Sequence, residues 1–99
     1  MSEPSAVIVT AATVAKLARG VRLREDAVRG QTILLAPERA LALDEIAVMI
    51  VNALDGKRSI DAIAEEFSLK FEAPKDQILA DIIVFVDEFS KRRMLELKP

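Results

Sequence analysis

The stretch ILLAPERALALDEIA, residues 33–47, decides the fold because it changes its structural character twice within a short span. Its first apolar run stops at Pro37, whose fixed φ suits the first central position of a tight turn. A second apolar run over residues 40–43 then returns antiparallel to the first. Asp44 follows with a side chain that can cap free N–H groups of a first helical turn. The stretch therefore predicts a hairpin that leads directly into a helix.

The residues upstream of this stretch predict another strand. Val21, Arg22, Leu23 and Arg24 alternate apolar and charged side chains, which is the pattern of a half-buried strand. We expect Val21 and Leu23 to face the core and the two arginines to face solvent.

Together these segments predict a three-stranded antiparallel sheet, and the sequence does not determine the order of its strands. The middle strand covers residues 32–36, with Ile33 and Leu35 as its better core candidates. In the third strand, Leu41 and Leu43 share one face, and Ala40 and Ala42 share the other.

Three helices should follow the sheet. The first covers residues 45–54 and is capped by Asp44, the second starts after the cap Ser59, and the third runs from Pro74 to about Lys91. Residues 94–97 predict a short final extended piece. Strands followed by helices indicate an α+β fold, here one that resembles a winged helix-turn-helix.

The chain of 99 residues has the length of one domain. We assign residues 16–99 to a single domain. Residues 1–15 are small and lack a clear period, so we expect a flexible N-terminal tail, the alternative being a strand that needs a partner.

Composition excludes several kinds of chemistry. The chain has no Cys and no His, which removes disulfides, imidazole catalysis and zinc sites built on these residues. The acidic pairs Glu65-Glu66 and Asp87-Glu88 are neighbours on predicted helices, and adjacent helical side chains point in different directions. We expect no catalytic residues, no metal and no cofactor, and therefore no enzyme.

The expected setting is the cytoplasm. No cationic segment precedes the apolar residues at the N-terminus, as a secretory signal would require. No apolar run approaches the ~20 residues of a membrane span. A net charge of −2 gives no electrostatic reason for binding nucleic acid or anionic lipid.

A winged-helix DNA-binding regulator is the alternative function. The two helices after Ser59 carry more acidic than basic residues, whereas a recognition helix needs the opposite balance to approach phosphates. This function is therefore disfavoured.

Two features indicate a surface for another polypeptide. If the strands lie in chain order, the strand over residues 40–43 has a free edge, and a free edge can pair with an incoming strand. The third helix also has a wide apolar stripe, of which Ile78, Ile82, Phe85 and Phe89 suffice to seat it on the core. A flank then remains to line a groove beside the edge strand: Leu79, Ile83 and Val86. The alternative is that all of these residues are ordinary core.

Particular motifs carry a family resemblance. The segments RGVRLREDAVRGQTILLAPERALALD, residues 19–44, and LDGKRSIDAIAEEF, residues 54–67, resemble the PqqD family of coenzyme pyrroloquinoline quinone biosynthesis. The resemblance covers about residues 14–97.

The resemblance implies a non-enzymatic peptide chaperone, a recognition element for a ribosomal precursor peptide (PqqA-like). Such a protein presents the peptide to a radical S-adenosylmethionine enzyme (PqqE-like), which cross-links a Glu and a Tyr. S-adenosylmethionine and the iron–sulfur cluster would belong to that enzyme. The implied peptide site is an added strand beside the third strand and third helix, here Arg39, Ala40, Leu41, Ala42 and Leu43 with Leu79, Ile83 and Val86.

The enzyme should meet a different surface, because the peptide and the enzyme are held together. We expect that surface to include two basic groups: Arg22 and Arg24 on the first strand, and Lys91, Arg92 and Arg93 near the C-terminus. We expect a monomer, although a short exposed strand edge also permits a swapped dimer.

Overall fold

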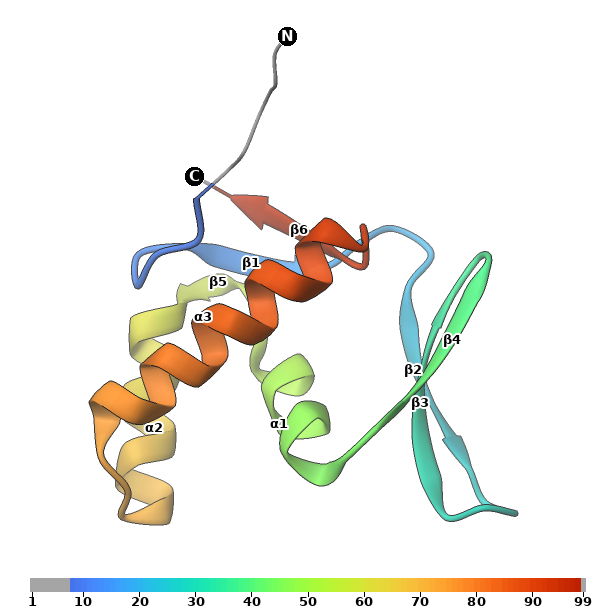
Figure 1. Cartoon of the computed structure of the whole chain (residues 1–99), viewed down its shortest axis with the longest axis horizontal. Coiled ribbons are helices and arrows are strands. Elements are labelled where there is room, and N and C mark those ends of the chain that lie inside the picture. The colour runs from blue at the N-terminus through green and yellow to red at the C-terminus, as the bar shows by residue number, and fades with distance from the viewer. Residues whose placement is uncertain (1–7, 99) are drawn as a thin grey trace, which may run out of the picture.

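The computed structural model describes residues 8–98, which form two antiparallel sheets and three helices (Figure 1). In chain order the elements are β1 (Val14–Leu17), β2 (Arg22–Asp26), β3 (Gln31–Ala36), β4 (Arg39–Leu43), α1 (Glu45–Ala53), β5 (Asp55–Ser59), α2 (Ile60–Phe71), α3 (Lys75–Lys91) and β6 (Leu95–Lys98). Within the described part of the chain, no helix is both long and apolar enough to cross a membrane.

The predicted sheet is present, with the strand order β2-β3-β4. Ala36 pairs with Arg39 across the turn at Pro37 and Glu38, so the hairpin loop has only those two residues. The α+β class, the three-stranded antiparallel sheet and the three helices are therefore confirmed. Figure 1 shows this sheet beyond α1, at one side of the molecule.

The inward face of this sheet is set by register. Leu23, Leu34 and Leu41 lie opposite one another across the three strands, and Leu34 is fully buried. Ile33 and Leu35 are only half-buried on the other face, where they lie opposite Arg24 and Arg22. The prediction that Ile33 and Leu35 face the core is wrong, because pairing with Leu23 turns Leu34 inward instead.

The first two helices begin at the predicted caps. The Asp44 carboxylate accepts a hydrogen bond from the Ala47 N–H at 2.7 Å, and the Ser59 hydroxyl accepts one from the Ala62 N–H at 3.1 Å. Each satisfies a backbone donor that the first helical turn leaves without a partner.

A second sheet, with the order β5-β1-β6, was not predicted. Its middle strand is β1, which pairs with β5 on one side and with β6 on the other. The predicted extended piece at the C-terminus is β6, whereas β5 lies between the first two helices, where no strand was predicted. Gly56, at φ 76°, lies within β5.

The expected tail over residues 1–15 needs correction where the structure describes it. Residues 1–7 lie outside the described residues. Val9 and Ala15 belong to the hydrophobic core, and Val14 and Ala15 lie in β1, so the division at residue 15 cuts through a strand. The alternative, a strand that needs a partner, describes residues 14–17.

Two hydrophobic clusters hold the molecule together. The larger cluster joins β1, α1, α2, α3 and β6. The smaller one consists of Val21, Leu34, Val51 and Met94, and it attaches the β2-β3-β4 sheet to the rest. Phe85 and Phe89 of α3 pack against both clusters, so α3 connects the two halves of the fold.

Candidate functional site

The outer edge of β4 is the first part of the candidate site. Within the described residues, β4 pairs only with β3, which leaves its other edge open. Leu41 and Leu43 pack against the smaller cluster, while Arg39, Ala40 and Ala42 are exposed. This edge therefore offers backbone groups next to small side chains.

The hairpin determines which backbone groups point outward. Antiparallel pairs alternate between hydrogen-bonded and non-hydrogen-bonded, and the pair that closes a two-residue loop is hydrogen-bonded. Counting from Ala36 and Arg39, the non-bonded positions of β4 are Ala40 and Ala42. Their N–H and C=O groups face the open edge, where an incoming strand would bond to them.

A groove between α1 and α3, the α1–α3 groove, begins where β4 ends. It has a volume of about 400 Å³ and is lined by residues from the N-cap and first two turns of α1 and from α3, namely Asp44, Ile46, Ala47, Ile50, Asp81, Val84, Phe85, Glu88 and Phe89. Phe85 and Phe89 stack with their ring centroids 4.2 Å apart. Both rings also pack against the cluster that Leu41 and Leu43 contact, and Asp44, which lines the groove, directly follows β4, so the groove lies next to the end of this strand.

The structure does not bring Leu79, Ile83 and Val86 to this groove. Val86 is fully buried in the larger cluster, and Leu79 and Ile83 pack against that cluster from its periphery. Since the side chain of Val86 does not reach the surface, the prediction that Val86 lines a groove beside β4 is wrong. Phe85, Phe89 and Val84 line the groove instead.

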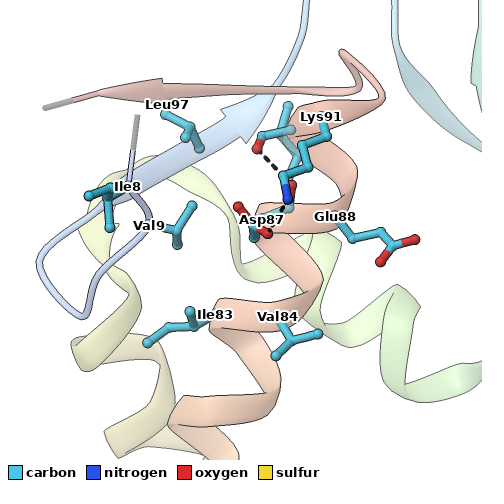
Figure 2. A pocket seen from close by; sticks show the side chains of 10 residues that line it. Ile8, Val9, Ile83, Val84, Asp87, Glu88, Lys91 and Leu97 are labelled. Carbon is cyan, nitrogen blue, oxygen red and sulfur yellow. Dashed lines mark hydrogen bonds and ion pairs between the residues drawn. The ribbon is translucent and has the colours of Figure 1, made fainter. Parts of the chain in front are cut away.

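Ile83 faces a different hollow, shown in Figure 2. This hollow lies between α3, β6 and the segment at Ile8 and Val9, and its volume is about 650 Å³. Figure 2 shows Lys91 at its rim, where its ammonium group pairs with Asp87 at 3.1 Å. Val84 and Glu88 line both this hollow and the α1–α3 groove, so these two residues of α3 separate the two depressions.

The residues expected to meet an enzyme lie in two places. Arg22 and Arg24 are exposed on the outer face of the β2-β3-β4 sheet, opposite Leu35 and Ile33. Lys91, Arg92 and Arg93 are exposed at the end of α3. There, Lys91 pairs with Asp87, and Arg92 pairs with Glu88 at 2.7 Å, so the helix itself balances part of this charge.

Perturbed ionisation occurs away from the groove, around α2 and β5. Carboxylates of Glu65 and Asp61 contact the Lys75 ammonium group and raise its pKa. Hydrogen bonds from the backbone N–H groups of Arg58 and Lys57 lower the pKa of Asp55. These are interactions at the surface, where a single ion pair contributes little to stability.

The donor residues for a metal do not gather in the described part of the chain. Across residues 8–98, no group of three or more His, Cys, Asp or Glu side chains could hold a metal ion. The arrangement found at the β4 edge is instead one that can bind an extended polypeptide.

Comparisons with known proteins give consistent results. The family model "Coenzyme PQQ synthesis protein D (PqqD)" matches residues 31–95. The PqqA binding protein of Rhizobium meliloti (strain 1021) is 60% identical over 92 residues, which cover 93% of this chain and 94% of that protein. The PqqA binding protein of Xanthomonas axonopodis pv. citri (strain 306) is 44% identical over 81 residues, covering 82% and 88% of the two chains.

Two solved structures share the fold. One is the solution structure of the PqqD truncation of Methylobacterium extorquens PqqCD, described as a functional and stand-alone recognition element for ribosomally synthesized and post-translationally modified peptides. It matches with a TM-score of 0.78 and 38% identity, covering 89% of this chain and 94% of that one. The crystal structure of PqqD from Xanthomonas campestris matches with a TM-score of 0.57 and 38% identity, covering 81% and 89%.

Proposed function

Because this chain belongs to the PqqD family, we propose that it binds a PqqA-like precursor peptide in pyrroloquinoline quinone biosynthesis, as a strand added to the edge of β4. The relatives are named for binding PqqA, and a family member of the same fold is described as a recognition element. The proposal transfers that role to this chain and assigns it to a particular edge.

One observation carries the placement: the open edge of β4 lies beside an apolar groove. Main-chain hydrogen bonds to Ala40 and Ala42 would supply affinity without regard to sequence, and the groove would select apolar side chains on the incoming strand. The small side chains at these two positions leave the edge accessible.

The protein acts in this proposal as a non-enzymatic chaperone in the cytoplasm. It presents the bound peptide to the radical S-adenosylmethionine enzyme of the pathway, which carries out the cross-linking of Glu and Tyr. That enzyme supplies the S-adenosylmethionine and the iron–sulfur cluster, since this chain has no Cys to ligate a cluster.

The enzyme would contact surfaces that the peptide leaves free. Arg22 and Arg24 belong to the strand at the opposite edge from β4, so they stay accessible when a peptide is bound. Lys91, Arg92 and Arg93 form a second candidate contact. A monomer suffices for this arrangement, and a swapped dimer remains an expectation from the open edge.

Titration of the isotopically labelled protein with the PqqA peptide of Rhizobium meliloti tests the proposal. We expect the largest amide shift changes in β4 and around Phe85 and Phe89. Changes confined to β1, β5 and β6 would disprove the placement, and the absence of any change at saturating peptide would disprove the function.

The DNA-binding alternative has less support. Two of the cations beside α2 are already paired: Arg58 with Asp55 and Glu66, and Lys75 with Asp61 and Glu65. A phosphate backbone would have to displace these carboxylates before it gained a contact. Retention on a DNA column at low salt would favour this alternative.

A further inference from the structure

We infer that the bound peptide continues past β4 into a second subsite, an apolar hollow edged by carboxylates, which selects a segment with a large apolar side chain next to Lys or Arg. The inference rests on the proposed function, because it extends the same site. It assigns a specificity that strand pairing alone does not provide.

The subsite is continuous with the α1–α3 groove. A hollow of about 380 Å³, the three-helix hollow, lies between α1, the end of α2 and α3. It shares Ile46, Ile50 and Asp81 with the α1–α3 groove, so a chain that leaves the groove enters the hollow directly. The two together extend from the end of β4 along α1.

Apolar side chains of the three-helix hollow are exposed to water when no peptide is bound. Ile46 is 68% exposed at its border, and Phe71 at the end of α2 is 48% exposed. A guest side chain seated between them would remove both from water, a gain of about 25 cal/mol for each Å² of apolar surface buried.

The charges at the rim all have one sign. Within residues 8–98, the charged residues that line the three-helix hollow are Glu45 and Asp81, and those that line the α1–α3 groove are Asp44, Asp81 and Glu88. Asp44 caps α1 and Glu88 pairs with Arg92. Among the described residues, Glu45 and Asp81 form no ion pair with a Lys or Arg of this chain.

Charge complementarity therefore identifies the occupant as a cationic and apolar segment of the peptide. The long stems of Lys and Arg can lie on apolar surface while their charged ends reach a carboxylate. Here the stem would lie on Ile46 and the charge would meet Glu45 or Asp81. An acidic segment would be repelled, so the subsite also discriminates against the wrong peptide.

The length of the recognised segment follows from the geometry. The distance along α1 from Asp44 to Ile50 is about 9 Å at 1.5 Å per residue, which about three extended residues span. The five residues of β4 pair with about as many guest residues. We expect a recognised segment of roughly eight residues, in which the cationic residue lies outside the paired part.

Calorimetric titration with the PqqA peptide of Rhizobium meliloti tests the inference at low ionic strength, where surface charges are least screened. The double variant Glu45→Gln/Asp81→Asn should weaken binding about five- to tenfold. Asp76→Asn is the matched control. Asp76 is an exposed carboxylate on α3, like Asp81, but it lines neither the α1–α3 groove nor the three-helix hollow, so this change should alter the affinity less than twofold.

The second part of the experiment uses a peptide in which Lys and Arg are replaced by Gln, so that protein and peptide variants form a double-mutant cycle. The double variant and the wild type should bind this peptide equally, because the interacting charge is already absent. The inference would be overturned if the double variant lost the same affinity for both peptides, or if its affinity for the native peptide did not change. Tight binding of a peptide without any cationic residue would also overturn it.

The apolar part is tested with Ile46→Ser, for which we expect at least about fivefold weaker binding. The matched control is Leu69→Ser, an exposed leucine of α2 that lines neither hollow. If Ile46→Ser instead changed the oligomeric state and left peptide affinity intact, a second copy would be the occupant and the inference would fail.

Strand addition and the second subsite are distinguished by comparing these variants. If Ala42→Pro abolishes binding while the changes at Glu45, Asp81 and Ile46 have no effect, strand addition stands and the subsite is wrong. If the wild type itself does not bind the peptide, both fail.

Discussion

Leu34 and Met94 are both fully buried in one cluster, although Leu34 lies in the middle of the β2-β3-β4 sheet and Met94 follows the last helix. The main-chain carbonyl of Met94 also accepts a hydrogen bond at 2.9 Å from the N–H of Ala18, which lies in the link between β1 and β2. The end of α3 thus fixes the sheet that carries the β4 edge.

The first prediction concerns this attachment. Met94→Ala should lower the free energy of unfolding by about 2–4 kcal/mol, because it leaves a cavity beneath Leu34. Urea denaturation measures the change. Leu69→Ala, at a 73% exposed position, is the control and should cost less than about 1 kcal/mol. A Met94→Ala protein as stable as the control would show that the cluster does not hold the sheet.

The open edge is tested by two proline variants. Ala42→Pro removes an N–H group that faces outward, so peptide affinity should fall at least about tenfold while the fold survives, as prolines are tolerated in edge strands. Leu41→Pro removes an N–H that bonds to β3 and should cost about 3 kcal/mol or more of stability. Denaturation and calorimetry on both variants separate these effects. The reverse pattern would show that β4 turns its other backbone groups outward.

The outer face of the sheet should govern the meeting with the enzyme. Reversing the charge at Arg22 and Arg24, by Arg22→Glu/Arg24→Glu, should weaken binding of the radical S-adenosylmethionine enzyme about tenfold and leave peptide affinity within about twofold. Lys91→Glu/Arg92→Glu should have a smaller effect, because both cations already pair with their own helix.

Surface plasmon resonance with the immobilised enzyme measures these changes. The control Lys57→Glu/Lys70→Glu reverses two exposed cations elsewhere on the molecule. A loss as large as that of the arginine variant would mean that overall charge, and not this face, determines the affinity.

The pH dependence of stability should include a contribution from Asp55. Hydrogen bonds from backbone N–H groups hold its pKa below the ordinary value of 3.8, so its contribution is present above about pH 3.8 and is lost as the pH falls through the lowered pKa. Asp55→Asn should therefore be less stable than the wild type at pH 7, and the difference should narrow below pH 4. Denaturation curves at pH 7 and pH 3 test this. A difference that widened in acid would contradict it.

Gly56 and Gly30 form a matched pair for backbone strain. Both have positive φ, at 76° and 65°, where an L-residue costs about 1–2 kcal/mol. A Cβ atom at Gly56 would also lie 3.3 Å from the Cβ atom of Lys16, whereas one at Gly30 would have nothing within 4 Å. Gly56→Ala should therefore lower the melting temperature more than Gly30→Ala. Equal losses would mean that β1 moves to make room.

The β2-β3-β4 sheet could be predicted because the sequence signals for its strands and turn each span only a few residues. The alternation at Val21 to Arg24 and the turn at Pro37 each act within a few residues. The inward face of β3 was missed for a physical reason: ILL is apolar throughout, so a period of two cannot choose between Ile33 and Leu34. Only the pairing with Leu23 makes the choice.

The second sheet and part of the site could not be predicted in this way. β5 has the sequence DGKRS, which carries no apolar pattern, and it is a strand because β1 pairs with it. The stripe on α3 is wide because the helix contacts two clusters. Its width gave no means of telling Val86, which is buried, from Phe85, which lines the groove.

The position of β1 between β5 and β6 has a consequence for the order in which a newly made chain can fold. The β2-β3-β4 sheet is contiguous in sequence and needs only short loops, so it can form while synthesis continues. β1 leaves the ribosome earlier, but its pairing is complete only after β6, residues 95–98, has also been made. The open edge of β4 would thus form before α3 and the second sheet are complete. A peptide that arrived at this stage would meet the edge without the α1–α3 groove.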